Sequence, residues 1–151
     1  MTSPPPPAEI LRGMQDLRIA FEAVTERVAK AAGLNPRDLG VLDILHADGP
    51  ATPKELTART GIHPATLTAA LARLERGGHT SRRTDPDDRR SARIAITDTT
   101  VRLLEQQYES VDNELGSWFG EMSASDRILI AAFLHTAASK ISTAGRVPRF
   151  E

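Results

Sequence analysis

The chain has 151 residues, which is enough for one domain with a hydrophobic core but not for two large independent domains. Hydrophobic residues make up 40% of the sequence and aromatic residues only 4%, a balance that favours a helical globular fold. Cysteine is absent, which excludes disulfide bonds, thiolate metal sites and redox sensing by cysteine. The start "MTSPPPPAEI" lacks the features of a secretory signal, and no apolar run could cross a bilayer, so we expect a cytoplasmic protein.

The formal net charge of −1 is unevenly distributed along the chain. Residues 59–93 contain eight arginines and four acidic residues, a local balance of +4 that leaves −5 for the remainder. Such an imbalance is typical of a protein that binds a polyanion with one part of its surface. A solvated charged face is the alternative interpretation of the same residues.

The N-terminal third of the sequence predicts a short tail and two helices. Residues 1–7 are rich in proline and predict a disordered or extended tail. From Ala8 onward apolar residues recur every three or four positions, which predicts a long helix that ends at Gly33. Pro36 begins a second helix, which ends at the sequence "ADGP".

Residues 52–77 have the sequence features of a helix-turn-helix. Thr52, Pro53 and Glu55 form a capping box that begins a short helix over residues 53–59. The sequence "TGIH" breaks that helix, and Pro64 begins a second one that ends at Gly77. The apolar residues of the second helix are spaced to share one face, as two short helices joined by a tight turn require.

The remainder of the chain predicts a hairpin and two more helices. The segments "HTSRRT" and "ARIAIT" read as short strands around an exposed charged turn, a wing appended to the helix-turn-helix. Apolar seams then predict helices from about Asp98 to Met122 and from about Ser125 to Thr143. The small winged unit cannot cover all the apolar surface of the terminal helices, so we expect a helical dimer interface. A monomer whose terminal helices pack on one another is the alternative.

The order of these elements resembles the MarR family of winged-helix transcription regulators over nearly the whole chain. The stretches "DPDDRRSARIAIT" and "GIHPATLTAALARLERGG" are similar to the family's wing signature and recognition helix. The resemblance implies a mainly α fold with a small β-hairpin wing, in which residues 35–98 form a winged helix-turn-helix lobe. Residues 8–34 and 99–144 would form the helical dimerisation region, and 145–151 a C-terminal tail. A family member of this kind is a homodimer that binds a pseudo-palindromic operator in double-stranded DNA, usually represses transcription and is often released by a small aromatic or phenolic effector.

The resemblance also assigns roles to individual residues. Arg90 is the wing-tip arginine that reaches the minor groove, where the negative potential attracts a guanidinium, and Asp88 braces the wing through an ion pair. Exposed Thr and Ala residues near the start of the second helix would meet base edges, where their methyl groups can contact thymine. Many family members have an arginine where this chain has Ala69. The expected DNA-binding residues are His63, Ala65, Thr66, Thr68, Ala69, Arg73, Arg82, Arg83, Asp88, Arg89, Arg90 and Arg93.

Effector, metal and catalytic sites are less well defined by the sequence. The candidate effector pocket comprises Leu17, Phe21, His46 and Tyr108, although apolar and aromatic residues at helical spacing are more often core. The four histidines show no metal-binding spacing, so we expect no metal and no cofactor. No nucleophile elbow, no phosphate loop and no paired carboxylates in an apolar setting are present, so we expect no catalytic residues and no enzyme. A transcriptional activator, or a winged helix that binds a protein instead of DNA, are the alternatives to a repressor.

Overall fold

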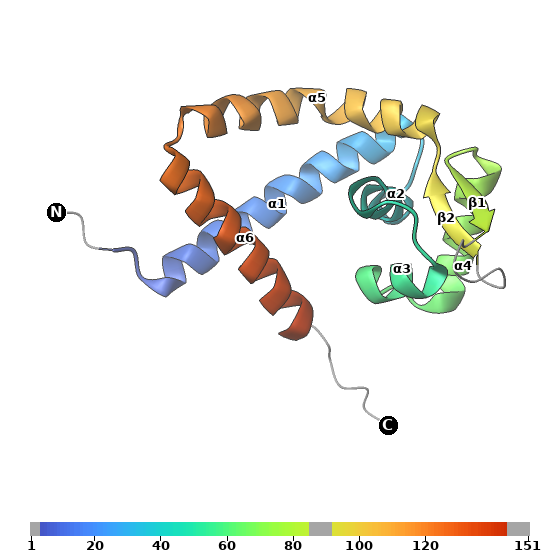
Figure 1. Cartoon of the computed structure of the whole chain (residues 1–151), viewed down its shortest axis with the longest axis horizontal. Coiled ribbons are helices and arrows are strands. Elements are labelled where there is room, and N and C mark those ends of the chain that lie inside the picture. The colour runs from blue at the N-terminus through green and yellow to red at the C-terminus, as the bar shows by residue number, and fades with distance from the viewer. Residues whose placement is uncertain (1–3, 85–91, 145–151) are drawn as a thin grey trace. The chain divides into compact units, whose positions relative to one another are not determined.

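The computed structural model describes residues 4–84 and 92–144, which form six helices and a two-stranded sheet (Figure 1). The chain divides into two compact units, one running up to Tyr108 and the other starting at Glu109, and each is considered separately. The elements are α1 (Pro7–Ala32), α2 (Pro36–Asp48), α3 (Pro53–Thr60), α4 (Pro64–Arg76), β1 (Thr80–Thr84), β2 (Ala92–Ile96), α5 (Asp98–Glu121) and α6 (Ala124–Ala144). These bounds confirm the mainly α fold with a β-hairpin wing.

The ends of the helices are fixed by local capping chemistry that can be recognised in the sequence. Gly33 ends α1 in the left-handed conformation, with φ of 69°, which an L side chain would strain. The side chain of Asn35 accepts a hydrogen bond from the backbone N–H of Asp38 at the start of α2. At α3, Thr52 and Glu55 form the reciprocal capping box that the sequence predicts. The predicted helix starts are therefore confirmed to within a residue or two.

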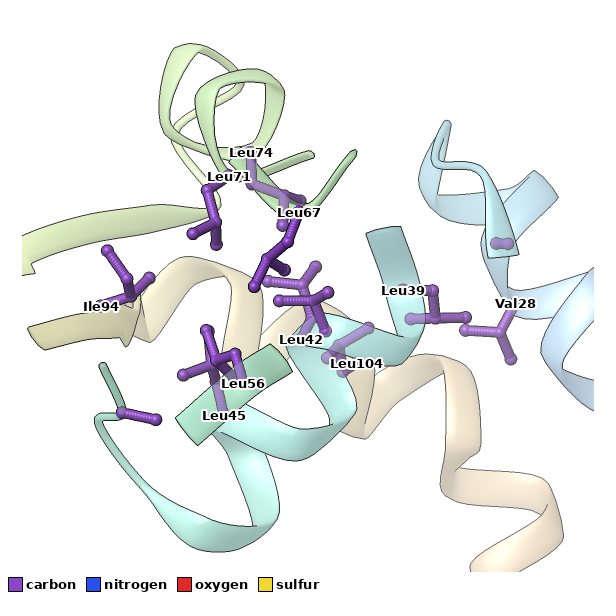
Figure 2. Packing of buried hydrophobic residues seen from close by; sticks show 13 residues of the cluster. Val28, Leu39, Leu42, Leu45, Leu56, Leu67, Leu71, Leu74, Ile94 and Leu104 are labelled. Atoms are coloured by element: carbon purple, nitrogen blue, oxygen red, sulfur yellow. The ribbon is translucent and has the colours of Figure 1, made fainter. Parts of the chain in front are cut away.

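The hydrophobic core of the first unit is built around α2. Leu39, Leu42 and Leu45 of this helix are completely or almost completely buried. Figure 2 shows Leu42 among side chains contributed by the helix-turn-helix and by the start of α5. Burying a leucine contributes about 1.5–3 kcal/mol, so this cluster is the main source of stability in the unit. Its principal members are Val28, Leu39, Leu42, Leu45, Leu56, Leu67, Leu71, Leu74, Ile94 and Leu104.

The hairpin is antiparallel and is joined to the helix-turn-helix by backbone hydrogen bonds. Thr80 pairs with Ile96 at one end of the ladder and Thr84 with Ala92 at the other. The backbone of Ile94 also exchanges two hydrogen bonds with Ala51, the residue just before the cap of α3, at 3.0 and 2.8 Å. The wing strands are thereby confirmed and fixed to the first helix of the motif. The charged turn that the sequence predicts falls within residues 85–91, which lie outside the described residues.

Polar residues at the start of β1 are accommodated by a side-chain network. Thr80 is buried, and the ring nitrogen Nδ1 of His79 lies 3.2 Å from the hydroxyl of Thr100. The Thr100 hydroxyl is in turn 3.0 Å from that of Thr97, which donates to the carbonyl of Gly78 at 2.9 Å. Because buried polar groups are costly only when unpaired, these contacts allow His79 and Thr100 to pack as polar side chains beside the hairpin.

The second unit contains the C-terminal part of α5 and the whole of α6. None of the residues of α6 is buried, and an apolar groove between its first turns and the end of α5 is lined by Phe119, Met122, Ile130 and Leu134. Two helices cannot enclose their own apolar side chains, so much of this surface faces solvent. The large exposed apolar side chains of the unit are Trp118, Phe119, Ile128, Leu129, Phe133, Leu134 and Ile141.

Candidate nucleic-acid interface

Helix α4 presents two chemically different faces. Its apolar residues Leu67, Ala70, Leu71 and Leu74 are buried in the core of the first unit. The opposite face is exposed and carries only small residues until the last turn. Thr66 lies at the edge of this face and is half-buried. Between Pro64 and the last turn, the exposed positions are Ala65, Thr68, Ala69 and Ala72.

His63 caps the N-terminus of α4. Its Nδ1 atom accepts a hydrogen bond from the backbone N–H of Ala65 at 3.3 Å. In a neutral imidazole the proton is then on Nε2, which remains a donor for a partner outside the helix. Pro64 follows at the first helical position, where its missing N–H costs nothing. The exposed imidazole of His63 therefore caps the N-terminus of α4 and offers one N–H group beside it.

A bidentate ion pair connects α4 to α2. Arg73 donates from Nε and from one terminal nitrogen to the two carboxylate oxygens of Asp38, at 2.9 and 2.8 Å. The Asp38 side chain is only 4% exposed, whereas that of Arg73 is 45% exposed. Hydrogen bonding to Asp38, followed by its charge, raises the pKa of Arg73 above its ordinary value. The guanidinium that the sequence assigns to DNA is therefore bound to a buried carboxylate.

Asp38 was not among the residues singled out in the sequence. An acid in the first turn of a helix is usually explained by its interaction with the helix dipole. Nothing in the sequence near Asp38 therefore indicates that it pairs with Arg73, 35 residues away.

The two strands of the hairpin that follows α4 (Figure 1) carry the arginines Arg82, Arg83 and Arg93. Arg83 on β1 is exposed and lies directly across the ladder from Arg93 on β2, an arrangement that is unfavourable for like charges. Arg93 donates to the carbonyl of Pro50 at 2.8 Å and lies 3.7 Å from Glu55. Arg82 forms an exposed ion pair with Glu75 at 3.2 Å, which contributes little to stability. A polyanion would relieve this concentration of positive charge. Asp88, Arg89 and Arg90 lie outside the described residues.

The predicted effector residues are all in the first unit, in two groups. Leu17 and Phe21 are about half exposed on α1. Tyr108 is half-buried, and its hydroxyl donates to the carboxylate of Asp43 at 3.3–3.4 Å. His46 is exposed one turn further along α2 and acts on Asp43 through its charge. Asp43 was missed by the sequence reasoning, although an acid inside the apolar run "VLDIL" is a recognisable signal.

Burial raises the pKa of Asp43 above its ordinary value of 3.8, while the Tyr108 hydrogen bond and His46 act in the opposite direction. The folded state thus binds this proton more tightly than the unfolded state does, and stability falls as the pH rises above 3.8 towards the folded pKa. We expect Asp43→Asn to reduce this loss, since an amide keeps an acceptor for Tyr108 without a charge. Urea denaturation between pH 4 and pH 7 at fixed protein concentration measures the free energy of unfolding of each protein as a function of pH. Exposed Asp16→Asn is the control, and an unchanged pH profile in Asp43→Asn would contradict the expectation.

Other types of site are not found in the part of the chain that the structure describes. Over residues 4–84 and 92–144, no three histidine or acidic side chains are grouped so that they could hold a metal ion. Within the same ranges, every helix is too short or too polar to cross a membrane.

A helix-turn-helix whose second helix is followed by an antiparallel hairpin defines the winged helix-turn-helix class. The model of the MarR family matches residues 32–91. The HTH-type transcriptional regulator YcgE of Bacillus subtilis is 32% identical over 113 residues, which cover 75% of this chain and 73% of that relative. The chain belongs to the MarR family of transcriptional regulators, and it is a regulator rather than an enzyme.

Solved structures share the fold over almost their entire length. NadR in complex with 4-hydroxyphenylacetate is 22% identical and superimposes with a TM-score of 0.69, covering 91% of this chain and 98% of NadR. The apo form of wild-type MarR from E. coli is 18% identical with a TM-score of 0.59, covering 89% of this chain and 98% of that one. These similarities confirm the predicted fold class.

Proposed function

We propose that the protein is a homodimeric repressor that binds a pseudo-palindromic operator in duplex DNA. The observation that carries this proposal is the exposed small-residue face of α4 beside the arginines of the hairpin. A recognition helix enters the major groove with its N-terminal residues against base edges, and side chains of small volume permit a close approach. The family membership of the chain supports the same conclusion.

Each predicted DNA residue has a place in this proposal. His63, Ala65, Thr66, Thr68 and Ala69 face the bases, and Arg82, Arg83 and Arg93 lie near the phosphates. Exposed ion pairs such as Arg82 with Glu75 exchange readily for a phosphate. Arg90, Asp88 and Arg89 belong to the wing turn, where we assign Arg90 to the minor groove. We assign Arg73 to holding α4 against α2, because two of its donors already bind Asp38.

The second subunit would bind the exposed apolar residues of the terminal helices. Ile128 and Leu129 are 71% and 70% exposed, which is unusual for side chains of this size. In α1, Ile10, Leu11 and Ile19 are also exposed. A dimer would cover such residues and hold two recognition helices about one turn of DNA, roughly 34 Å, apart.

A small aromatic effector would act by changing that spacing. We place it near Leu17, Phe21, His46 and Tyr108, as the family resemblance implies, with the Tyr108–Asp43 contact as the source of polar groups. The similarity to NadR in complex with 4-hydroxyphenylacetate supports a ligand of this chemical class. Release of the operator requires that the effector bind the two spacings with different affinities.

Selection from a random duplex library tests the proposal, with the wild type and Arg90→Ala compared on the winning sequence. We expect an inverted repeat and, for the variant, an affinity lower by about tenfold with a reduced dependence on salt. Arg102→Ala, which removes an exposed charge near the start of α5, is the matched control and should bind like the wild type. Failure to enrich any sequence, with and without phenolic ligands, would contradict DNA-binding repression.

A further inference from the structure

We propose that α4 recognises its operator through the C5 methyl groups of thymine, so that the base pairs facing this helix are mainly T·A. The inference rests on the proposed binding of α4 in the major groove and specifies what the helix reads there. It follows from the side chains that the helix exposes, from the hydrogen bond of Thr68 to Pro64 and from the ion pair of Arg73 with Asp38.

The exposed face of α4 is a continuous row of methyl groups. Ala65, Thr68, Ala69 and Ala72 follow one another at the i, i+3, i+4 and i+7 spacing that places residues on one side of a helix. Each residue ends in a methyl group. Alanine and threonine methyls are the side-chain groups that pack against the thymine C5 methyl in the major groove. Two turns of the helix therefore offer an apolar surface suited to thymine.

Thr68 contributes its methyl group rather than a hydrogen-bond donor. Its hydroxyl donates to the carbonyl of Pro64, four residues earlier, at 2.9 Å. The oxygen can still accept a hydrogen bond, for example from the amino group of adenine, but its proton is not available for guanine or for thymine O4. A T·A pair provides both a methyl group and an amino donor in the major groove, so it matches this side chain.

The long side chains of α4 are poorly placed to read guanine. Bidentate contacts from arginine to guanine O6 and N7 are the commonest specific contacts in the major groove. Arg73 is bound to Asp38, and Arg76, in the last turn, donates from Nε to the carbonyl of Ala72 at 3.3 Å. The N-terminal part of the helix approaches the bases most closely, and residues 64–72 contain no arginine. G·C pairs would therefore find few partners along this face.

Replacing thymine by deoxyuridine in the selected operator isolates this contribution, because it removes only the C5 methyl group. Burial of one methyl group corresponds to about a fourfold change in affinity. We expect substitution at the α4-facing thymines to weaken binding about fourfold per buried methyl and by about tenfold or more over both half-sites. The salt dependence should stay the same, since no phosphate contact is altered. Fluorescence anisotropy with labelled duplexes at fixed salt measures both quantities.

Two substitutions at one position separate the methyl group from the hydroxyl. Thr68→Ser keeps the hydroxyl and removes the methyl, and it should reduce the ratio between thymine and uracil affinities. Thr68→Val keeps a methyl at this position and removes the hydroxyl, and it should preserve that ratio. Tight binding of a selected site without sensitivity to uracil, or loss of the ratio in Thr68→Val but not in Thr68→Ser, overturns the inference alone. Absence of salt-dependent binding to any duplex overturns the proposed function as well.

Discussion

Replacing Ile128 and Leu129 together with glutamate is expected to yield a monomer that binds the operator at least about a hundredfold more weakly. These side chains are 71% and 70% exposed on α6, and two carboxylates would prevent an apolar interface from closing over them. A dimer binds its second half-site with the advantage of a high effective concentration, which typically increases affinity by about 10²–10⁴. Loss of the dimer removes that advantage without any change in α4.

Light scattering coupled to size exclusion measures the mass, and anisotropy measures the affinity for full and half operators. The double variant Thr99→Glu, Gln106→Glu adds the same charge at exposed polar positions of α5 and should remain dimeric. A double variant at 128 and 129 that stays dimeric would place the interface elsewhere. A monomer that still binds the full operator as tightly as the wild type would contradict the role of dimerisation in recognition.

Leu42→Ala is expected to destabilise the protein by about 2–5 kcal/mol, a large part of the 5–15 kcal/mol typical of folded proteins. Leu42 is completely buried in the cluster shown in Figure 2, where α2 meets the helix-turn-helix and the start of α5. Truncation loses the transfer free energy of the removed atoms and leaves a cavity that the neighbouring leucines only partly fill.

Urea denaturation at a fixed protomer concentration measures this loss, since the stability of a dimer depends on concentration. Leu42→Met is the volume-conserving control and should cost less than about 1.5 kcal/mol. If both substitutions destabilise equally, shape rather than volume limits the packing at this position. A loss below about 1 kcal/mol for Leu42→Ala would show that α2 is not the centre of the core.

The helices and the hairpin could be predicted because their boundaries depend on nearby residues. The capping box of Thr52 and Glu55, the prolines at helix starts and Gly33 at a helix end each act within one turn. The buried face of α4 follows from the spacing of its leucines in the same way. Sequence patterns of this kind are sufficient to locate the helices and strands, and the family resemblance supplied their expected arrangement.

The polar contacts between helices could not be predicted from the same patterns. Arg73 has the charge and the sequence position expected of a DNA contact, but its partner Asp38 lies 35 residues away on another helix. Tyr108 and Asp43 are 65 residues apart and are brought together only by packing of α5 on α2. Arg93 likewise finds the carbonyl of Pro50 across the fold. Side-chain pairing over such separations depends on tertiary structure, to which local periodicity is insensitive.

Arg73 holds α4 against α2 through its ion pair with Asp38. In the proposed complex, the same donors of Arg73 cannot bind Asp38 and DNA at once. A phosphate that drew the guanidinium away would leave a carboxylate without a partner in a site that is almost inaccessible to water. An unpaired buried charge is costly, so the exchange is opposed by the protein's own interior. Under the proposed function, the pair would therefore fix the angle at which α4 meets DNA and would oppose the transfer of Arg73 to a phosphate.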